Sequence, residues 1–414
     1  MKSKEVLSRD YLHVHLTQSY LPGGGGLEQS ISNIITALSE PNSIVVCISS
    51  GDKEKDGEYD RKSNIKIVRS NSHLFQYAKI LNHNFNSIVS GNTKLSAKGK
   101  LSMLVLSALS TALLLGSARR VVKRSTSKSV IITAYSMNAL LVAIILRTIM
   151  QKNIKIIFSN HFAYTKSGFK PVDLILRIAL KEADYTISVS NYSKAELIRN
   201  FGVNEIQSHV CYNWIDLKVL PYRQDYPKNN PKRLLFVGRI VPEKGIRVAI
   251  EFAKYIKINN IPYEITVIGD SNHPIKNELI NLAETNNRIR YLGRVDKPEI
   301  WKHYMQSDYF FMPVQWEEGF GNVILEAYAF GLPVIGTARG AIPEIVGHFA
   351  EGKIIHSSDP REIIQALSDL GKSQLLSNRV EVIKLNRLVI NKYFSSSNRN
   401  VHESINIALT QEKI

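Results

Sequence analysis

The sequence predicts an α/β protein built from two doubly wound domains, and three observations point to it. Short apolar strands alternate with amphipathic helical stretches along both halves of the chain. The stretch at 223–233 is polar, carries prolines and lacks periodicity, which is typical of a linker. The length of 414 residues, with 44% hydrophobic content, is enough for two ordinary cores.

The first domain is expected at 1–222 and begins with a strand at residues 11 to 16. The apolar stretch at 139–150 lies between the strand-like segments SVIITAY and IKIIF, so it is predicted to be a buried crossover helix. The second domain is expected at 234–395. Its strands are predicted at 234–237, 263–268, 289–292, 308–313, 333–336 and 353–356.

The stretch from Glu318 to Glu344 carries the strongest functional signal. Glu318 and Glu326 flank Gly319 and Gly321, and a short helix follows the glycines. Unpaired N–H groups at a helix start bind phosphate, and glycines let it approach closely. Glu318 precedes the helix and Glu326 lies about one turn inside it, so the two carboxylates would reach different hydroxyls of one ligand. Backbone-held phosphate and carboxylate-held hydroxyls together indicate a nucleotide sugar.

A second segment, RLLFVGRIVPEKG, indicates the same kind of ligand. An apolar strand turns at Gly238, and Arg239 and Lys244 stand between this strand and the next helix. Ligands bind at the carboxyl ends of strands in open α/β sheets, and two cations there would neutralise a leaving diphosphate. Surface cations are the simpler interpretation, but positive charge is unfavourable at a helix start. That placement therefore favours an anionic ligand.

These motifs resemble the retaining glycosyltransferases of family four, the group 1 glycosyl transferases, whose GT-B fold has two Rossmann-like domains facing a cleft. The resemblance rests on GRIVPEKG, the Glu-seven-residues-Glu element and AFGLPVIGTARGAIPEIV, and it is strong from Arg233 to Val346. PGGGGLEQ is similar to the family's glycine loop, IIFSNHFAY to its histidine-bearing strand and CYNWID to its Asn-Gly-x-Asp turn. The match is loose from Asp52 to Ser129. The resemblance also implies that 396–414 forms a helix crossing back to the first domain.

The resemblance implies a hexosyltransferase that moves a sugar from a UDP- or GDP-sugar to a saccharide acceptor with retention of anomeric configuration. The acceptor is expected to be lipid-linked, in cell-surface polysaccharide or lipopolysaccharide synthesis. By the family's pattern, Glu326 accepts hydrogen bonds from the ribose, while Glu318 and His161 contact the donor sugar. The expected catalytic residues are Glu318, His161, Arg239 and Lys244, and the expected donor-binding residues are Gly23, Gly24, Gly238, Arg239, Lys244, Gly319, Phe320, Gly321, Asn322 and Glu326.

No metal or other cofactor is expected, because the sequence has no DxD-like acidic pair in a suitable place. The glycine run at 23–26 lacks the last glycine of a dinucleotide fingerprint, so NAD binding is not expected. Asn213 and Asp216 are open to a turn-stabilising role, since Trp214 stands where the family usually has glycine. His161 is open to the interpretation of a hydrogen-bonded loop histidine.

Two other functions stay open. One is a GT-B epimerase or phosphorylase, although the pyridoxal lysine context of a phosphorylase is not found. The other is non-enzymatic nucleic-acid binding by the basic first half, which has no recognisable binding motif and leaves the second domain's site unexplained. Nucleic acid is therefore not an expected partner.

Positive charge is concentrated in the first half of the chain. Residues 61–172 contain 18 Lys and Arg and no Asp or Glu. A block this one-sided attracts polyanions such as an anionic membrane surface. Arg119, Arg120, Lys123 and Arg124 follow an apolar stretch that is too short and too rich in serine to span a bilayer. The segment 101–124 is thus predicted either to dock on a membrane surface or to be a core helix with a solvated basic end.

The amino terminus and the cysteines indicate the compartment. The first residues lack an apolar stretch followed by a small-residue cleavage site, so no signal peptide is predicted. Cys47 and Cys211 are too few and too far apart for a disulfide framework. We expect a cytoplasmic protein, with peripheral binding to the inner face of the cytoplasmic membrane as its membrane alternative.

Overall fold

The computed structural model describes residues 11–21, 26–38, 42–48, 53–63, 65–70, 97–166, 170–222, 229–373 and 378–395. Gly23, Gly24 and the segment 396–414 lie outside these residues, as does most of the expected linker. The chain forms two compact units that divide between Cys211 and Tyr212, which is earlier than the expected end of the first domain at residue 222.

Two hydrogen bonds explain why the segment from Tyr212 belongs to the second unit. The Tyr212 hydroxyl donates to Glu344 Oε1 at 2.8 Å, and Asn213 Nδ2 donates to Asn322 Oδ1 at 2.9 Å. Both acceptors lie in the second half of the chain. The turn CYNWID is therefore tied to the second core before the polar stretch begins.

The first unit is a seven-stranded parallel sheet with the order β3-β2-β1-β4-β5-β6-β7. Its strands read as nearly continuous apolar runs, such as SIVVCI and SVIITA, because a parallel sheet is covered on both faces. The elements are β1 (Tyr11–Leu16), α1 (Gly26–Leu38), β2 (Ser43–Ile48), α2 (Lys53–Lys62), β3 (Lys66–Ser70), α4 (Ala97–Arg124), β4 (Ser129–Ala134), α5 (Met137–Ile149), β5 (Asn153–Asn160), α6 (Lys170–Glu182), β6 (Tyr185–Ser188), α7 (Asn191–Phe201) and β7 (Ser208–Val210).

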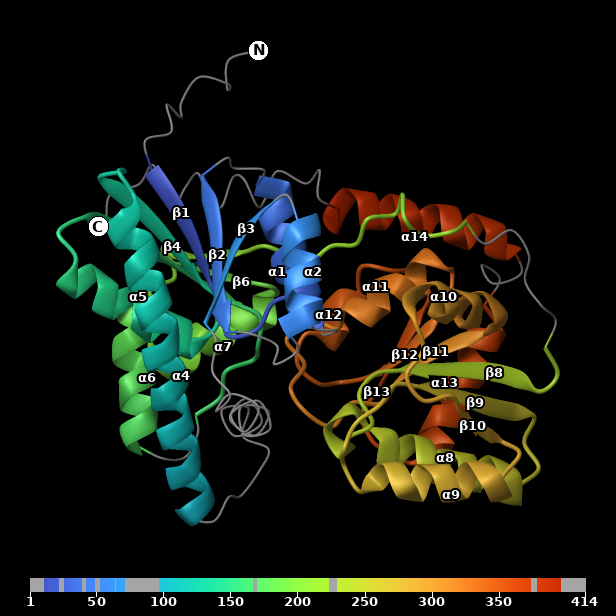
Figure 1. Ribbon diagram of the computed structural model, residues 1–414. Coiled ribbons are helices and arrows are strands. Elements are labelled where there is room, and N and C mark those ends of the chain that lie inside the picture. Colours follow the sequence, from blue (N-terminus) through green and yellow to red (C-terminus); the bar gives the residue numbers. More distant parts are fainter. Residues whose placement is uncertain are drawn as a thin grey trace. The chain divides into compact units, whose positions relative to one another are not determined.

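Helices α4, α5 and α6 cover one face of this sheet, and α1 packs on the other (Figure 1). The predicted crossover helix at 139–150 is α5, and its buried residues confirm that it belongs to the core. The segment 101–124 falls within α4. From residue 107 onward this helix places Leu114, Ala118 and Val122 in the core while its basic end is exposed, which matches the second of the two alternatives.

The second unit is a six-stranded parallel sheet with the order β10-β9-β8-β11-β12-β13. Helices α8 and α9 lie on one face, and α10, α11 and α12 lie on the other (Figure 1). The elements are β8 (Lys232–Val237), the 3-10 turn η1 (Pro242–Lys244), α8 (Ile246–Ile258), β9 (Tyr263–Ile268), α9 (Ile275–Thr285), β10 (Ile289–Tyr291), α10 (Lys297–Gln306), β11 (Tyr309–Met312), α11 (Asn322–Ala329), β12 (Val334–Thr337), α12 (Ile342–Val346), β13 (Gly352–Ile355), α13 (Pro360–Gly371) and α14 (Arg379–Tyr393).

The predicted α/β class with two doubly wound sheets is confirmed. All six strands predicted for the second domain are present, and the expected strand at 263–268 coincides with β9. Both sheets have a point at which the chain changes direction: between β1 and β4 in the first unit, and between β8 and β11 in the second. Ligands of such sheets bind beyond the carboxyl ends of the strands at that point.

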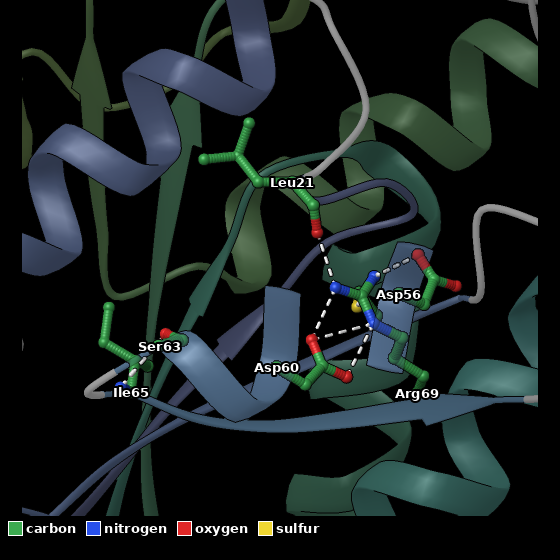
Figure 2. A network of polar contacts seen from close by, with 7 residues as sticks. Leu21, Asp56, Asp60, Ser63, Ile65 and Arg69 are labelled. Carbon is green, nitrogen blue, oxygen red and sulfur yellow. Dashed lines mark hydrogen bonds and ion pairs between the residues drawn. The ribbon is translucent and has the colours of Figure 1, made fainter. Parts of the chain in front are cut away.

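A buried arginine ties together the edge of the first sheet (Figure 2). Arg69 on β3 donates to both carboxylate oxygens of Asp60 at 2.7 to 3.1 Å and forms an ion pair with Asp56 at 3.4 Å. It also donates to the carbonyl oxygen of Leu21 at 2.5 Å. Arg69 thus fixes the end of the loop that follows β1, and its fork-shaped group suits several acceptors at once.

The two cysteines are buried and unbridged, as core-packing thiols are. Burial raises the pKa of both thiols to about 12. Within the described part of the chain, none of the helices combines the length and the apolar character needed to cross a bilayer.

Candidate functional site

The loops that follow β8 and β11 come together at the switch point of the second sheet. The two strands are neighbours, with Tyr309 opposite Leu234, but the chain leaves them toward opposite edges of the sheet. Arg239 and Lys244 lie in the loop after β8, and Glu318 lies in the loop after β11. The sheet topology therefore explains how residues about 75 positions apart in sequence come to share one site.

Two close backbone approaches lock these loops against each other. Gly245 has a φ of +85°, and a Cβ atom on it would lie 1.9 Å from the carbonyl oxygen of Pro313. The Gln315 N–H donates to the carbonyl oxygen of Glu243 at 2.8 Å. Only glycine fits the first contact, because it combines a left-handed backbone with no room for a side chain. The residue before it, Lys244, is thereby directed toward the loop after β11.

Lys244, Glu318 and Trp316 form the polar centre of the site. The Lys244 ammonium contacts Glu318 Oε2 at 2.5 Å, and the Trp316 indole N–H donates to the same oxygen at 2.9 Å. The ammonium also lies over the Trp316 ring, 4.7 Å from its centroid, and the Arg239 guanidinium carbon lies 5.8 Å from that centroid. Both cations predicted from the sequence therefore gather around one indole ring and one carboxylate.

The carboxylate of Glu318 is held in its ionised form. Burial alone would raise its pKa, but the Lys244 charge, the hydrogen bonds from Lys244 and Trp316, and the Arg239 charge together lower the pKa below its usual value. The side chains of Lys244 and Glu318 are 18% and 13% exposed, so the pair is largely shielded from water. A ligand would meet a preformed carboxylate flanked by cations.

The segment after β12 holds the backbone of Glu318. Gly340 has a φ of +60°, and a Cβ atom there would lie 2.2 Å from the Glu318 carbonyl oxygen. The Ala341 N–H donates to that oxygen at 2.8 Å, and the Gly340 N–H donates to Glu317 Oε2 at 2.6 Å. The segment with the sequence GTARGA therefore holds Glu318, a catalytic candidate, in place through these two hydrogen bonds.

The amino end of α11 begins directly after this loop. Gly321 caps the helix with a φ of +89°, and Asn322 is its first residue. Phe320 is 3% exposed and packs its ring against Tyr212 and Phe394, with ring centroids 6.1 Å apart in both cases. Any contact between residue 320 and a ligand would thus come from its backbone. The side chain fixes the helix start instead.

Glu326 lies one turn inside α11, and Tyr304 on α10 binds it. The Tyr304 hydroxyl donates to Glu326 Oε2 at 3.0 Å. Tyr304 is fully buried, and its ring is stacked with Phe310 and Phe330. Burial raises the pKa of Glu326, and the bond from Tyr304 and the Lys297 charge only partly oppose this rise. The two glutamates thus have opposite pKa shifts, which is typical of groups with different roles.

His161 belongs to the first unit, directly after β5. Its Nε2 is 3.1 Å from Ser159 Oγ, and its Nδ1 is buried with no hydrogen-bond partner among the described residues. Burial lowers the pKa of His161 to about 4, so the ring is neutral at pH 7. The Tyr135 ring lies 5.8 Å away and links it to His15, whose Nδ1 is 3.0 Å from the Tyr135 hydroxyl.

The other candidates are placed as follows. Gly238 precedes Arg239 and donates its N–H to Ile268 at 3.0 Å, which joins the loop after β8 to β9. Asp216 accepts from the Lys218 N–H at 2.9 Å, the pattern of a side chain that stabilises a turn. The described residues hold no group of three or more His, Cys, Asp or Glu side chains arranged for a metal ion.

Three residues of the site were not predicted from the sequence: Trp316, Tyr304 and Gly340. Trp316 stands two positions before Glu318, so its proximity was available as a signal. Tyr304 and Gly340 reach the glutamates only through the tertiary fold, and no local pattern marks them.

Comparison with known proteins decides the family. The family described as "Glycosyl transferases group 1" matches residues 221–387, and the one described as "Glycosyltransferase Family 4" matches residues 101–219. The chain belongs to the group 1 glycosyltransferases of the GT-B type. The family resemblance seen in the motifs is thereby confirmed.

Individual relatives match parts of this group 1 chain. An uncharacterized 41.2 kDa protein in the cps region of Klebsiella pneumoniae is 26% identical over 233 residues, covering 53% of this chain and 63% of the relative. An amylovoran biosynthesis glycosyltransferase of Erwinia amylovora is 27% identical over 153 residues, covering 35% of this chain and 37% of the relative. The matches thus span about a third to two thirds of these relatives' own lengths.

A solved structure shows the same fold. Anabaena HepE, determined in complex with UDP and glucose, superposes with a TM-score of 0.68 at 18% identity, covering 97% of this chain and 99% of HepE. The GT-B fold expected for this group 1 glycosyltransferase is therefore confirmed.

Proposed function

We propose that this chain transfers a hexose from a nucleoside-diphosphate sugar to a saccharide acceptor, with retention of the anomeric configuration. The observation that carries the proposal is the cluster at the switch point of the second sheet. There, Arg239 and Lys244 gather with Glu318 around Trp316, and the glycine-capped start of α11 follows directly. Cations, helix-start N–H groups and carboxylates together suit a ligand with both diphosphate and hydroxyl groups.

The donor in this proposal is a UDP- or GDP-sugar. UDP is favoured as the first to test, because the structurally similar HepE was solved with UDP and glucose. The diphosphate would lie between the two cations and the N–H groups at Gly321 and Asn322. The Glu326 oxygen that Tyr304 does not bind would accept from the ribose hydroxyls, while Tyr304 holds the carboxylate in place.

The difficult step is the growth of negative charge on the departing phosphate oxygens. Arg239 and Lys244 would stabilise this charge without reorganising, because contacts with Trp316 and Glu318 already hold them in place. Glu318 stays ionised, so its carboxylate would stabilise positive charge developing on the sugar ring. By the family resemblance, His161, which is neutral at pH 7, takes part in binding the donor sugar. No metal ion is required for these roles.

The acceptor in this proposal is a lipid-linked saccharide of a cell-surface polysaccharide. The support comes from relatives: one lies in a cps region, and another is an amylovoran biosynthesis glycosyltransferase. The acid-free block at 61–172 agrees with an acceptor held at an anionic lipid surface.

Turnover assays on Glu326→Ala test the proposal. Release of nucleoside diphosphate from UDP- and GDP-sugars should fall by about a hundredfold or more, because the variant loses the ribose contact and the carboxylate that the buried Tyr304 hydroxyl holds in place. Glu299→Ala is the matched control, since Glu299 is exposed on α10 and pairs with the exposed Lys302. Full activity in Glu326→Ala would refute the site, and a product of inverted anomeric configuration in an NMR spectrum would refute retention.

A further inference from the structure

Helix α6 is apolar on two opposite sides. Leu176, Ala179 and Leu180 point into the core of the first unit. The opposite side exposes three large aliphatic side chains, Leu174, Ile175 and Ile178, with exposed fractions of 57%, 51% and 55%. A helix at a water-covered surface normally has a polar outer face, so this pattern indicates that something other than water covers α6.

Helix α5 also exposes two aliphatic side chains, on the side of the helix opposite Arg147. Ile145 and Ile149, one turn apart near the end of α5, are 36% and 50% exposed. Arg147 lies between them in sequence and pairs with Glu182 at 2.7 Å, which joins the last turn of α5 to the last turn of α6. The two helices also pack against each other on the same face of the sheet (Figure 1). The outer side of α6, with Leu174, Ile175 and Ile178, and the turn of α5 that Arg147 joins to it are together called here the α5–α6 face.

Basic side chains border the α5–α6 face. Lys170, Arg177 and Lys181 on α6 are all exposed, at the spacing that places them beside the aliphatic residues. The only acids on α6 are Asp173 and Glu182, and Glu182 is paired with Arg147. The border is thus positively charged, as is the exposed end of α4 with Arg119, Arg120, Lys123 and Arg124.

Among the described residues, α6 exposes more large aliphatic side chains than α4 does. From the sequence, 101–124 is open either to membrane docking or to a place in the core, because apolar residues directly precede a basic cluster. From residue 107 onward, however, α4 turns Leu114, Ala118 and Val122 into the core and exposes Leu109 and the basic cluster. The α5–α6 face, in contrast, presents aliphatic and basic side chains together.

We propose that the α5–α6 face docks on an anionic lipid surface, with its aliphatic side chains at the acyl boundary and its Lys and Arg at the headgroups. Charge decides between a membrane and a second copy of the chain. A two-fold contact would bring one basic border against another, whereas an anionic bilayer is complementary to both the apolar centre and the border. The proposal rests on the proposed function only in that it gives the enzyme access to a lipid-linked acceptor.

Co-sedimentation with vesicles tests the proposal. The full chain should bind vesicles of phosphatidylglycerol and phosphatidylcholine tightly and bind pure phosphatidylcholine weakly. Replacing Leu174, Ile175 and Ile178 together by serine should lower the partition coefficient by about fivefold per side chain, or about a hundredfold in all. Replacing Lys170, Arg177 and Lys181 by glutamine should lower binding to the anionic vesicles by a similar factor, at about fivefold per charge.

A matched triple variant controls for the loss of exposed aliphatic area in general. Ile206, Ile258 and Leu388 are 65%, 82% and 64% exposed and lie away from the α5–α6 face in sequence. Their replacement by serine should leave vesicle binding unchanged. Equal binding of the wild type to anionic and neutral vesicles, or unaltered binding of the Leu174/Ile175/Ile178 variant, would overturn the proposal. The proposal would also be overturned if the wild type and the control variant form a dimer in sedimentation velocity and the Leu174/Ile175/Ile178 variant does not.

Titration with UDP-glucose in the absence of vesicles separates this proposal from the proposed function. The Leu174/Ile175/Ile178 variant should bind the donor as the wild type does, because the substitutions lie in the first unit and on its surface. Normal donor binding without vesicle binding would refute docking alone. Vesicle binding without affinity for any nucleotide sugar would refute the proposed function alone.

Discussion

Replacing Lys244 by methionine tests the polar centre of the site directly. Methionine keeps most of the apolar stem but removes the ammonium, which lies 2.5 Å from Glu318 Oε2. The carboxylate then keeps the hydrogen bond from Trp316 but loses its closest positive charge. Because its side chain is only 13% exposed, water cannot fully replace the lost partner.

The distance and the exposure set the expected magnitude. At an effective dielectric constant of about 20, two unit charges at this separation attract by roughly 6 to 7 kcal/mol. The ammonium also costs desolvation, which methionine avoids, and removing one partner of a buried pair typically costs about 3 to 5 kcal/mol. With part of both side chains still in water, we expect the free energy of unfolding of the second unit to fall by about 3 kcal/mol.

Urea denaturation followed by tryptophan fluorescence measures this loss. All three tryptophans, Trp214, Trp301 and Trp316, belong to the second unit, so the signal reports on that unit. The double variant Lys244→Met/Glu318→Gln should be less destabilised than the sum of the two single variants, with a coupling free energy of about 2 kcal/mol. If the losses in unfolding free energy of the two single variants simply add in the double variant, the ion pair does not form and the reasoning fails.

The pH dependence of this loss follows from the pKa of Glu318. In the wild type this pKa is lowered, so the carboxylate contributes stability above its unfolded pKa near 4.5 and loses it as pH falls through the folded value. Without the Lys244 ammonium, the folded pKa should rise. The loss in unfolding free energy caused by Lys244→Met should therefore be largest at pH 7 and become smaller as pH falls toward 4.5.

Three further predictions concern backbone fit, histidine burial and the Arg69 network. Gly340→Ala should lower turnover by about a hundredfold, because its Cβ would lie 2.2 Å from the carbonyl oxygen of Glu318. Gly293→Ala is the control and should keep turnover, since Gly293 also has a positive φ, +67°, but nothing lies within 4 Å of its Cβ. The stability of the wild type should decline as pH falls from 6.5 toward 4, because the unfolded chain binds a proton at His161 that the folded chain resists; His161→Asn should flatten this decline in thermal melts. Arg69→Met should destabilise the first unit by about 3 kcal/mol in denaturation followed by circular dichroism, since it leaves Asp60 unpaired, and an unchanged midpoint would contradict the network.

The sheets, and the positions of the candidate site residues after their strands, could be predicted from the sequence because parallel strands leave a strong local pattern. Such strands are covered on both faces and form short apolar runs, so the predicted strand at 263–268 coincides with β9 and the one at 333–336 differs from β12 by one residue at each end. Arg239, Lys244 and Glu318 were identifiable because glycines and charges follow such strands directly. The switch point then follows from the order of strands in the sheet.

The partners of these residues could not be predicted, because they depend on tertiary contacts. Tyr304 lies 22 positions before Glu326 and meets it only because α10 and α11 pack on the same face of the second sheet. Gly340 fits beneath Glu318 because β12 runs next to β11. The two alternatives for 101–124 could not be separated either, since an apolar stretch beside a basic cluster has the same local pattern at a membrane surface and at the edge of a core.

Calorimetric titration with UDP-glucose and GDP-sugars tests the central claim most directly. That claim is that the switch point of the second sheet binds a nucleoside-diphosphate sugar through its two cations and the start of α11. We expect the wild type to bind at least one of these donors and the Arg239→Ala/Lys244→Ala variant to bind it at least a hundredfold more weakly, because two charge-assisted contacts with the diphosphate are lost at about 1.5 to 3 kcal/mol each. Equal affinity of the two proteins for that donor would contradict the account.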